Sequence, residues 1–78
     1  MTNTQNPRPT AVAEADEMVA TFAAPPVDDL DKVMRRAWFA ALLGWGGLPD
    51  RDRDPVRYVQ AVTAAVDSAN VAYLAAVA

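Results

Sequence analysis

Apolar side chains recur at alternating spacings of three and four along three stretches of the chain, which predicts three amphipathic helices. The first helix is expected at about residues 10–24, with Thr10 as its N-cap and Pro25-Pro26 at its end. Its apolar residues share one face: Val12, Ala15, Met18, Val19 and Phe22. Polar and acidic residues occupy the opposite side, so this helix has one narrow surface to bury.

The second helix is expected at about residues 29–45, between the capping pair Asp28-Asp29 and the glycines that precede Leu48-Pro49. Its inward stripe is flanked by Trp38 and comprises Leu30, Met34, Ala37, Ala41 and Trp45. Phe39 and Leu43 lie on the opposite side of the helix. The C-terminal half is therefore apolar nearly all round, which is typical of a helix covered on both sides.

The third helix is expected at about residues 55–78, where Asp54-Pro55 supplies a cap and a first helical residue. Its packing face comprises Val59, Val62, Val66, Ala69, Tyr73 and Ala76. Val71 and Leu74 lie on the other, mostly polar side. At about 1.5 Å per residue this helix is near 36 Å long and the second is near 25 Å long, so an antiparallel pairing leaves about two turns overhanging.

The expected fold is all-α, with a disordered tail at residues 1–9 and a single small helical domain at residues 10–78, in which the last two helices form an antiparallel hairpin. Apolar residues make up 53% of the 78-residue chain, but many are Ala and bury little area. Chains below about 70–80 residues usually need a disulfide, a metal, unusually good packing or association. The sequence holds no Cys and no His, so we expect oligomerisation or a partner to complete the fold.

The expected partner surface uses the apolar residues that lie on the wrong side of their own helices: Phe39, Leu43, Val71 and Leu74. The tryptophans have two interpretations, because large aromatic side chains form both cores and binding hot spots. Four further candidates complete the interface: Trp38, Trp45, Tyr73 and Val77.

Charge limits the choice of partner. The net charge of −3 argues against nucleic acid, since attachment to phosphates depends on positive charge. A small basic patch on the second helix is expected to be solvated or to pair with a protein partner: Lys32, Arg35 and Arg36.

The longest apolar run, residues 37–48, has 12 residues and three glycines, which is too short to span a membrane. The polar N-terminus shows no secretory signal, and the lack of Cys fits a reducing, cytoplasmic compartment.

No catalytic, metal or cofactor site is expected. The spacing Asp50-x-Asp52-x-Asp54 is that of an EF-hand calcium loop, but Pro55 stands where that loop has Gly and Ala61 where it has Glu. A solvated turn capped by Asp54 explains these acids better. Without His or Cys, a general base near neutral pH would have to be a strongly shifted carboxylate or Lys32, and Ser68 has no evident activating neighbour, so we expect no enzymatic activity.

The segment Arg35-Arg-Ala-Trp-Phe-Ala-Ala-Leu-Leu-Gly-Trp45 resembles the Trp-containing amphipathic segment of phasins, proteins that coat polyhydroxyalkanoate granules. The resemblance covers about a seventh of the chain, which lacks the long Lys/Glu-rich helices that follow in that family. It implies a peripheral coat on an apolar surface, in which these residues would lie in the apolar boundary: Trp38, Phe39, Leu42, Leu43 and Trp45.

Three functional hypotheses follow. The first is a non-enzymatic assembly or accessory subunit that packs apolar helix faces against copies of itself or a larger protein complex. The alternative is a peripheral coat or anchor on a lipid or polymer surface through the Trp-rich end of the second helix. The third is a small acidic inhibitor or regulator that occupies another protein's basic site.

Overall fold

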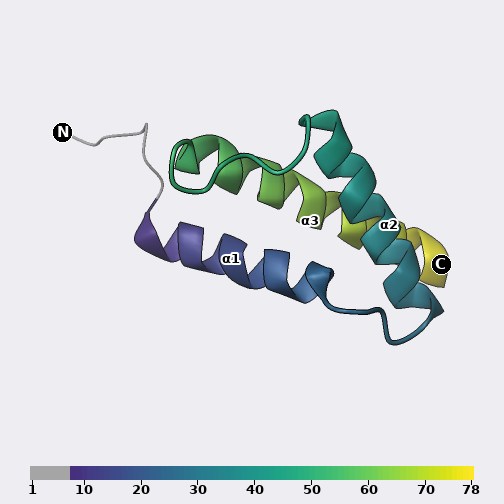
Figure 1. Ribbon diagram of the computed structural model, residues 1–78. Helices are drawn as coiled ribbons and strands as arrows, with labels where there is room; N and C mark the ends of the chain where they lie inside the picture. The colour runs from purple at the N-terminus through teal and green to yellow at the C-terminus, as the bar shows by residue number, and fades with distance from the viewer. Residues whose placement is uncertain (1–7) are drawn as a thin grey trace.

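Three helices and two connecting loops make up residues 8–78, the part of the chain that the computed structural model describes (Figure 1). They are α1 (Pro9–Ala23), α2 (Asp29–Gly44) and α3 (Pro55–Val77). Residues 8–78 contain no strand, so the predicted all-α fold is confirmed. The predicted disordered tail falls mostly on residues 1–7, which lie outside the described residues.

The start of α1 differs from the prediction by one residue. Pro9 is the first helical residue, and Arg8 takes the cap position without a side-chain hydrogen bond. Thr10 is therefore not the N-cap, and the predicted tail ran one residue too far. Proline suits the first helical position because its fixed φ matches a helix and its missing amide would have no intrahelical partner there.

The other two helices begin at the predicted caps. The Asp28 carboxylate accepts a hydrogen bond from the Asp31 amide at 2.7 Å, and the Asp54 carboxylate accepts one from the Arg57 amide at 3.3 Å. Each bond satisfies an amide that the first turn of a helix leaves without an intrahelical acceptor.

The end of α2 is a glycine-dependent turn. The Gly47 amide donates to the Leu42 carbonyl at 2.9 Å, and the Gly46 amide donates to the Leu43 carbonyl at 3.0 Å, which is the pattern of a Schellman motif. Gly46 has a φ of 79°, a left-handed conformation that a side chain would disfavour. This turn directs the chain toward Leu48 and the loop that leads to α3.

The hairpin of α2 and α3 is antiparallel, as predicted. At one end, the Arg57 guanidinium of α3 lies over the Trp45 ring at 5.0 Å and donates to the Trp45 carbonyl at 3.2 Å. At the other end, Leu30 and Met34 of α2 line a shallow hollow together with Tyr73 of α3. In Figure 1, α2 crosses the C-terminal half of α3, while α1 runs in the same direction as α3.

The core follows α3, which packs against both other helices. Its buried residues are Tyr58, Ala61, Val62, Ala65 and Ala69, facing Ala15 and Phe22 of α1 and Trp38 and Leu42 of α2. Of the predicted packing face, Val62 and Ala69 are buried, and Val59 and Val66 are partly buried against the core. The prediction was wrong for Tyr73 and Ala76, which are exposed, and it missed Ala61 and Ala65, which have no exposed surface. Small side chains at the centre of the face let the neighbouring helices approach closely.

The first helix is held at its C-terminal end by an aromatic stack and by Arg35. The rings of Phe22 and Trp38 are stacked 4.5 Å apart at 7°. Arg35 of α2 donates to the carbonyls of Ala24 at 2.8 Å and Thr21 at 3.0 Å. These carbonyls belong to the last turn of α1, where acceptors lack intrahelical donors. Arg35 therefore caps α1 from a neighbouring helix.

Candidate protein interface

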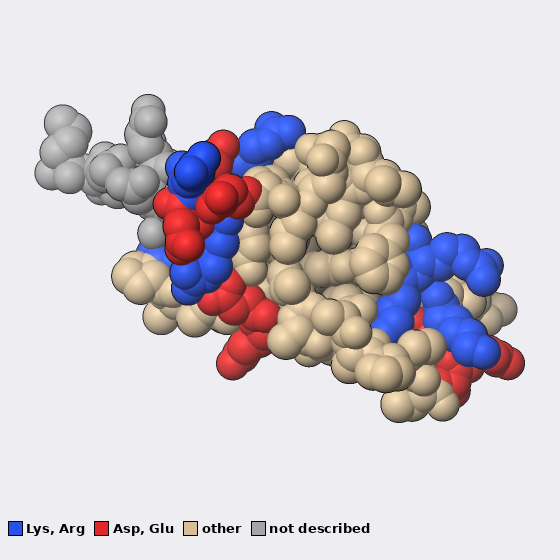
Figure 2. All heavy atoms as spheres, in the orientation of Figure 1, with Lys and Arg blue, Asp and Glu red and all other residues tan. Residues whose placement is uncertain are grey.

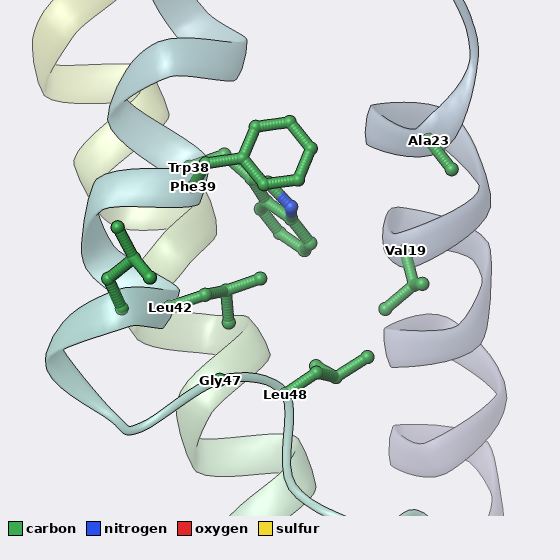
Figure 3. Close-up of a pocket in the computed structure, with 8 residues that line it drawn as sticks. Val19, Ala23, Trp38, Phe39, Leu42, Gly47 and Leu48 are labelled. Atoms are coloured by element: carbon green, nitrogen blue, oxygen red, sulfur yellow. The ribbon is translucent and has the colours of Figure 1, made fainter.

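An apolar groove of about 500 Å³ lies between α1 and α2, closed at one end by the loop that follows α2 (Figure 3). Its lining contains only apolar residues and one glycine: Val19, Ala23, Trp38, Phe39, Leu42, Leu43, Gly47 and Leu48. Figure 3 shows Val19 of α1 and Leu48 of the loop pointing toward one another across the groove. The groove thus combines side chains of α1 with those of α2 and the loop that directly follows α2.

Buried and exposed side chains divide the groove into a floor and a rim. Trp38 is 2% exposed and Leu42 is also buried, so these two form the floor. Phe39 is 54% exposed, Leu43 is 77% exposed and Leu48 is 44% exposed. Clustered apolar side chains with this much exposure are typical of surfaces that bind a protein or another apolar body.

Charged side chains border this face rather than cross it. In Figure 2, Lys, Arg, Asp and Glu side chains gather at the two ends of the molecule and leave the middle of the face uncharged. Arg36 precedes Phe39 by one turn on the same side of α2, and it forms no ion pair with any residue of 8–78. Lys32, one turn earlier still, has only a long contact of 3.8 Å to Asp29.

The predicted basic patch is not a single surface. Arg35 pairs with Asp31, as its (i, i+4) spacing predicts, and its guanidinium also binds the end of α1. The backbone hydrogen bond from Val27 and the Arg35 guanidinium lower the pKa of the Asp31 carboxyl. Only Lys32 and Arg36 of the predicted patch remain exposed to solvent.

The predicted interface residues fall into two separate groups. Phe39 and Leu43 lie together at the groove, whose lining includes no residue of α3. Val71 is 67% exposed and Leu74 is 63% exposed, and both lie on the side of α3 away from its buried face. These four residues therefore do not form one continuous patch.

The remaining candidates differ in exposure. Trp38 lies in the core of the chain itself, which is one of the two interpretations its sequence position allowed. Trp45 is half-buried beneath the Arg57 guanidinium. Tyr73 and Val77 are exposed beside the C-terminal turns of α3. Both tryptophans thus pack against other residues of the same chain. The resemblance to phasins implied instead that they lie at an apolar surface outside the protein.

A polar cluster joins α1, the second loop and α3. The Tyr58 hydroxyl donates to Asp16 at 2.6 Å, and the Arg51 Nε donates to both oxygens of the same carboxylate at 2.8 Å. Arg51 and then Tyr58 lower the pKa of Asp16, while burial and the bond to Asp16 raise the pKa of Tyr58 to about 12. The Asp16 carboxylate raises the pKa of Arg51. This cluster is a structural latch that fixes α1 on α3.

Sequence reasoning missed Asp16 and Tyr58. The signal was nonetheless present, because Asp16 stands one turn after Val12 and one turn before Val19, within the apolar stripe of α1. Tyr58 likewise precedes Val62 by one turn on the buried face of α3. A carboxylate on a packing face needs a donor from a neighbouring element, and a buried tyrosine hydroxyl needs an acceptor.

Asp50 and Asp54 of the acidic loop accept hydrogen bonds from nearby backbone amides. The Asp50 carboxylate accepts hydrogen bonds from the amides of Asp52 at 2.9 Å and Arg53 at 3.0 Å, and Asp54 caps α3. Within residues 8–78 no group of three or more His, Cys, Asp or Glu side chains is arranged to hold a metal ion. Among the helices of the same residues, none is both long and apolar enough to cross a bilayer.

The fold and this surface define a class: a small three-helix protein with an uncovered apolar groove and a second apolar surface at the end of its last helix. Comparison of the chain with protein-family models, with curated proteins and with solved structures finds no match.

Proposed function

We propose that this chain is a non-enzymatic assembly or accessory subunit, which packs its exposed apolar surfaces against a protein partner. The observation that supports the proposal best is the groove between α1 and α2, with Phe39, Leu43 and Leu48 exposed on its rim. An apolar groove between helices is the form of site that receives the apolar face of a partner helix. The partner is either another copy of the chain or a larger protein.

The composition of the groove favours a protein over a small ligand. Pockets for small molecules of about 300–1,000 Å³ place a few polar groups that fix the orientation of the ligand. The lining here has no polar side chain except the Trp38 indole, which lies in the floor. A partner helix needs no such groups, because its own backbone hydrogen bonds are already satisfied.

Two further features of the whole sequence fit this role. The net charge of −3 disfavours nucleic acid as the partner. We also expect a cytoplasmic location, and the absence of cysteine is compatible with that reducing compartment.

The test is native mass spectrometry of the protein purified from its source, with Leu43→Lys and Val27→Lys as a matched pair. Both positions carry exposed aliphatic side chains, but Val27, at 86% exposure, lies in the loop between α1 and α2 and outside the groove. Leu43→Lys is expected to weaken the complex by roughly tenfold or more, as loss of an interface hot spot does, while Val27→Lys leaves it unchanged. If the two substitutions change the strength of the complex equally, the groove is not part of the interface.

A further inference from the structure

Two exposed surfaces of this chain have the same length along their helices and carry complementary charges. The first, which we call the α2 stripe, consists of Arg36, Phe39 and Leu43. The second, the α3 stripe, consists of Asp67, Val71 and Leu74. Each stripe begins with a charge and continues with two apolar residues at helical spacing, and its first and last residues are seven positions apart. The charges are of opposite sign.

All six side chains are exposed, and the two charges are free to pair with a partner. Neither Arg36 nor Asp67 forms an ion pair within residues 8–78. The apolar members of both stripes are each more than half exposed, which is unusual for four aromatic or branched aliphatic residues in so small a domain.

The two stripes cannot meet within one chain. The α2 stripe borders the groove on the side of α1 and the loop, and no residue of α3 lines that groove. By the 100° step of a helix, Val71 and Leu74 lie roughly 160–220° around α3 from the buried Tyr58, on the side away from α1 and α2. A contact between the stripes therefore requires two molecules.

We propose that the α2 stripe of one copy packs in parallel against the α3 stripe of a second copy. In this register Arg36 lies opposite Asp67 and Leu43 opposite Leu74, while Phe39 and Val71 are offset by one residue. The antiparallel alternative places Arg36 against Leu74 and Asp67 against Leu43, which leaves both charges over apolar side chains without a partner. Charge pairs at the edge of an apolar helix seam are a known means of setting orientation and partner choice.

This inference rests on the proposed function and names its partner as a second copy of the chain. Because the two stripes differ, the contact is heterologous: one copy keeps its α3 stripe free and the other keeps its α2 stripe free. Such a contact either closes into a ring, including a dimer with two equivalent contacts, or continues as a filament. The α3 stripe also supplies the apolar side chains that fill the groove beside Phe39 and Leu43.

Charge exchange tests the register. Sedimentation velocity of the wild type over a range of concentrations is expected to show association. Arg36→Asp and Asp67→Arg, made singly, are each expected to weaken association by roughly tenfold, because each places like charges opposite one another. The double variant Arg36→Asp/Asp67→Arg is expected to recover it to within about threefold. A double variant as weak as the singles, or singles that associate like the wild type, would overturn the proposal.

Mixing two blocked variants tests the heterologous geometry. Leu43→Asp removes the α2 stripe and Leu74→Asp removes the α3 stripe, so each variant alone is expected to be monomeric. Their mixture retains one intact contact and is expected to give a one-to-one pair and nothing larger. Either variant dimerising alone would show contact between like surfaces and overturn the proposal. Thermal melts followed by circular dichroism check that each variant folds.

The outcomes also separate this inference from the proposed function. A wild type that stays monomeric at high micromolar concentration, but whose complex with a different chain is lost in Leu43→Lys, overturns self-association and leaves the proposed function standing. A wild type that is monomeric and forms no complex with any protein removes both.

Discussion

The N-terminal and C-terminal parts of α3 both contain many apolar residues but have opposite surroundings. Residues 55–69 include every buried side chain of this helix, whereas no residue from Asn70 to Val77 is buried. Both halves are rich in Ala and Val. Apolar sequence therefore does not decide burial here. What differs between the two parts is the presence of α1, which lies beside residues 59–67.

The reach of α1 explains much of the contrast. It has 15 residues against 23 in α3, about 22 Å against about 34 Å, so it covers only part of its neighbour. The Asp16–Tyr58 bond fixes it at the N-terminal half of α3, and its residues 11–18 lie beside residues 59–67. The last turns of α3 extend beyond it, with Val71, Leu74 and Val77 exposed.

The largest effect is expected in the covered region, at Trp38. Trp38→Ala removes the ring stacked on Phe22 and leaves a cavity, which we expect to lower the free energy of unfolding by about 3–5 kcal/mol. Total stability for a chain of this length is roughly 4–12 kcal/mol, so much of the variant is expected to unfold at physiological temperature. Urea denaturation measures the change. Phe39→Ala is the control, since this adjacent aromatic residue is mostly exposed and its loss should change stability by under about 1 kcal/mol.

A matched pair of substitutions within α3 compares its two halves directly. Ala65 has no exposed surface and faces the neighbouring helices, whereas Ala75 is exposed in the uncovered turns. Ala65→Leu is expected to destabilise the fold by about 1–3 kcal/mol through overpacking. Ala75→Leu is expected to stay within about 0.5 kcal/mol of the wild type. Equal effects in chemical denaturation would mean that the two halves do not differ in packing.

The contrast within α3 also shows what the sequence could and could not predict. Helix ends were predicted to within one residue, because Asp28, Asp54, Pro25 and the glycines after Leu43 act on the local backbone. The centre of the buried face was less predictable. Val59 and Ala61 are both apolar, so hydrophobicity alone offers no contrast between them, and the close approach of neighbouring helices favours the smaller residue at the centre of the face.

The residues of the groove likewise include some that the sequence predicted and others that it could not predict. The sequence placed Phe39 and Leu43 outside the packing stripe of their own helix, and the structure has both exposed. The second wall of the groove was not predictable, because Val19 and Ala23 reach it only through the placement of α1. Contacts between distant residues hold α1 in that place, among them the Asp16–Tyr58 bond across 42 positions and the Phe22–Trp38 stack, and local periodicity does not reveal them.

Loss of the hydrogen bond between Tyr58 and Asp16 is expected to lower stability by an intermediate amount, and the contribution of this bond is expected to depend on pH. Tyr58→Phe deletes the bond to Asp16 and is expected to lower stability by about 1–2 kcal/mol at neutral pH. The pKa of Tyr58 is raised to about 12 from an ordinary value of 10.0, so between these values the unfolded chain holds fewer protons than the folded one. Stability from this group is thus complete below pH 10 and is lost as pH rises toward 12.

Thermal melts from pH 8 to pH 11.5 measure that signature. The melting temperature of the wild type is expected to fall more steeply above pH 10 than that of Tyr58→Phe. Tyr73→Phe serves as control, because Tyr73 is exposed in the uncovered half and its hydroxyl forms no hydrogen bond within residues 8–78. If the melting temperatures of the wild type and Tyr58→Phe fall equally with pH, ionisation of Tyr58 is not coupled to folding.

The smallest effect on intrinsic stability is expected at Leu74, in the uncovered half. Leu74→Ala removes exposed surface and keeps a strong helix former, so the monomer should change by no more than about 0.5 kcal/mol. A partner that covers this half would add stability that grows with protein concentration. Wild type and Leu74→Ala should therefore unfold alike at nanomolar concentration and diverge at micromolar concentration, where only the wild type gains. A loss of about 2–5 kcal/mol at every concentration, the range expected for Leu42→Ala in the core, would instead place Leu74 in contact with its own chain.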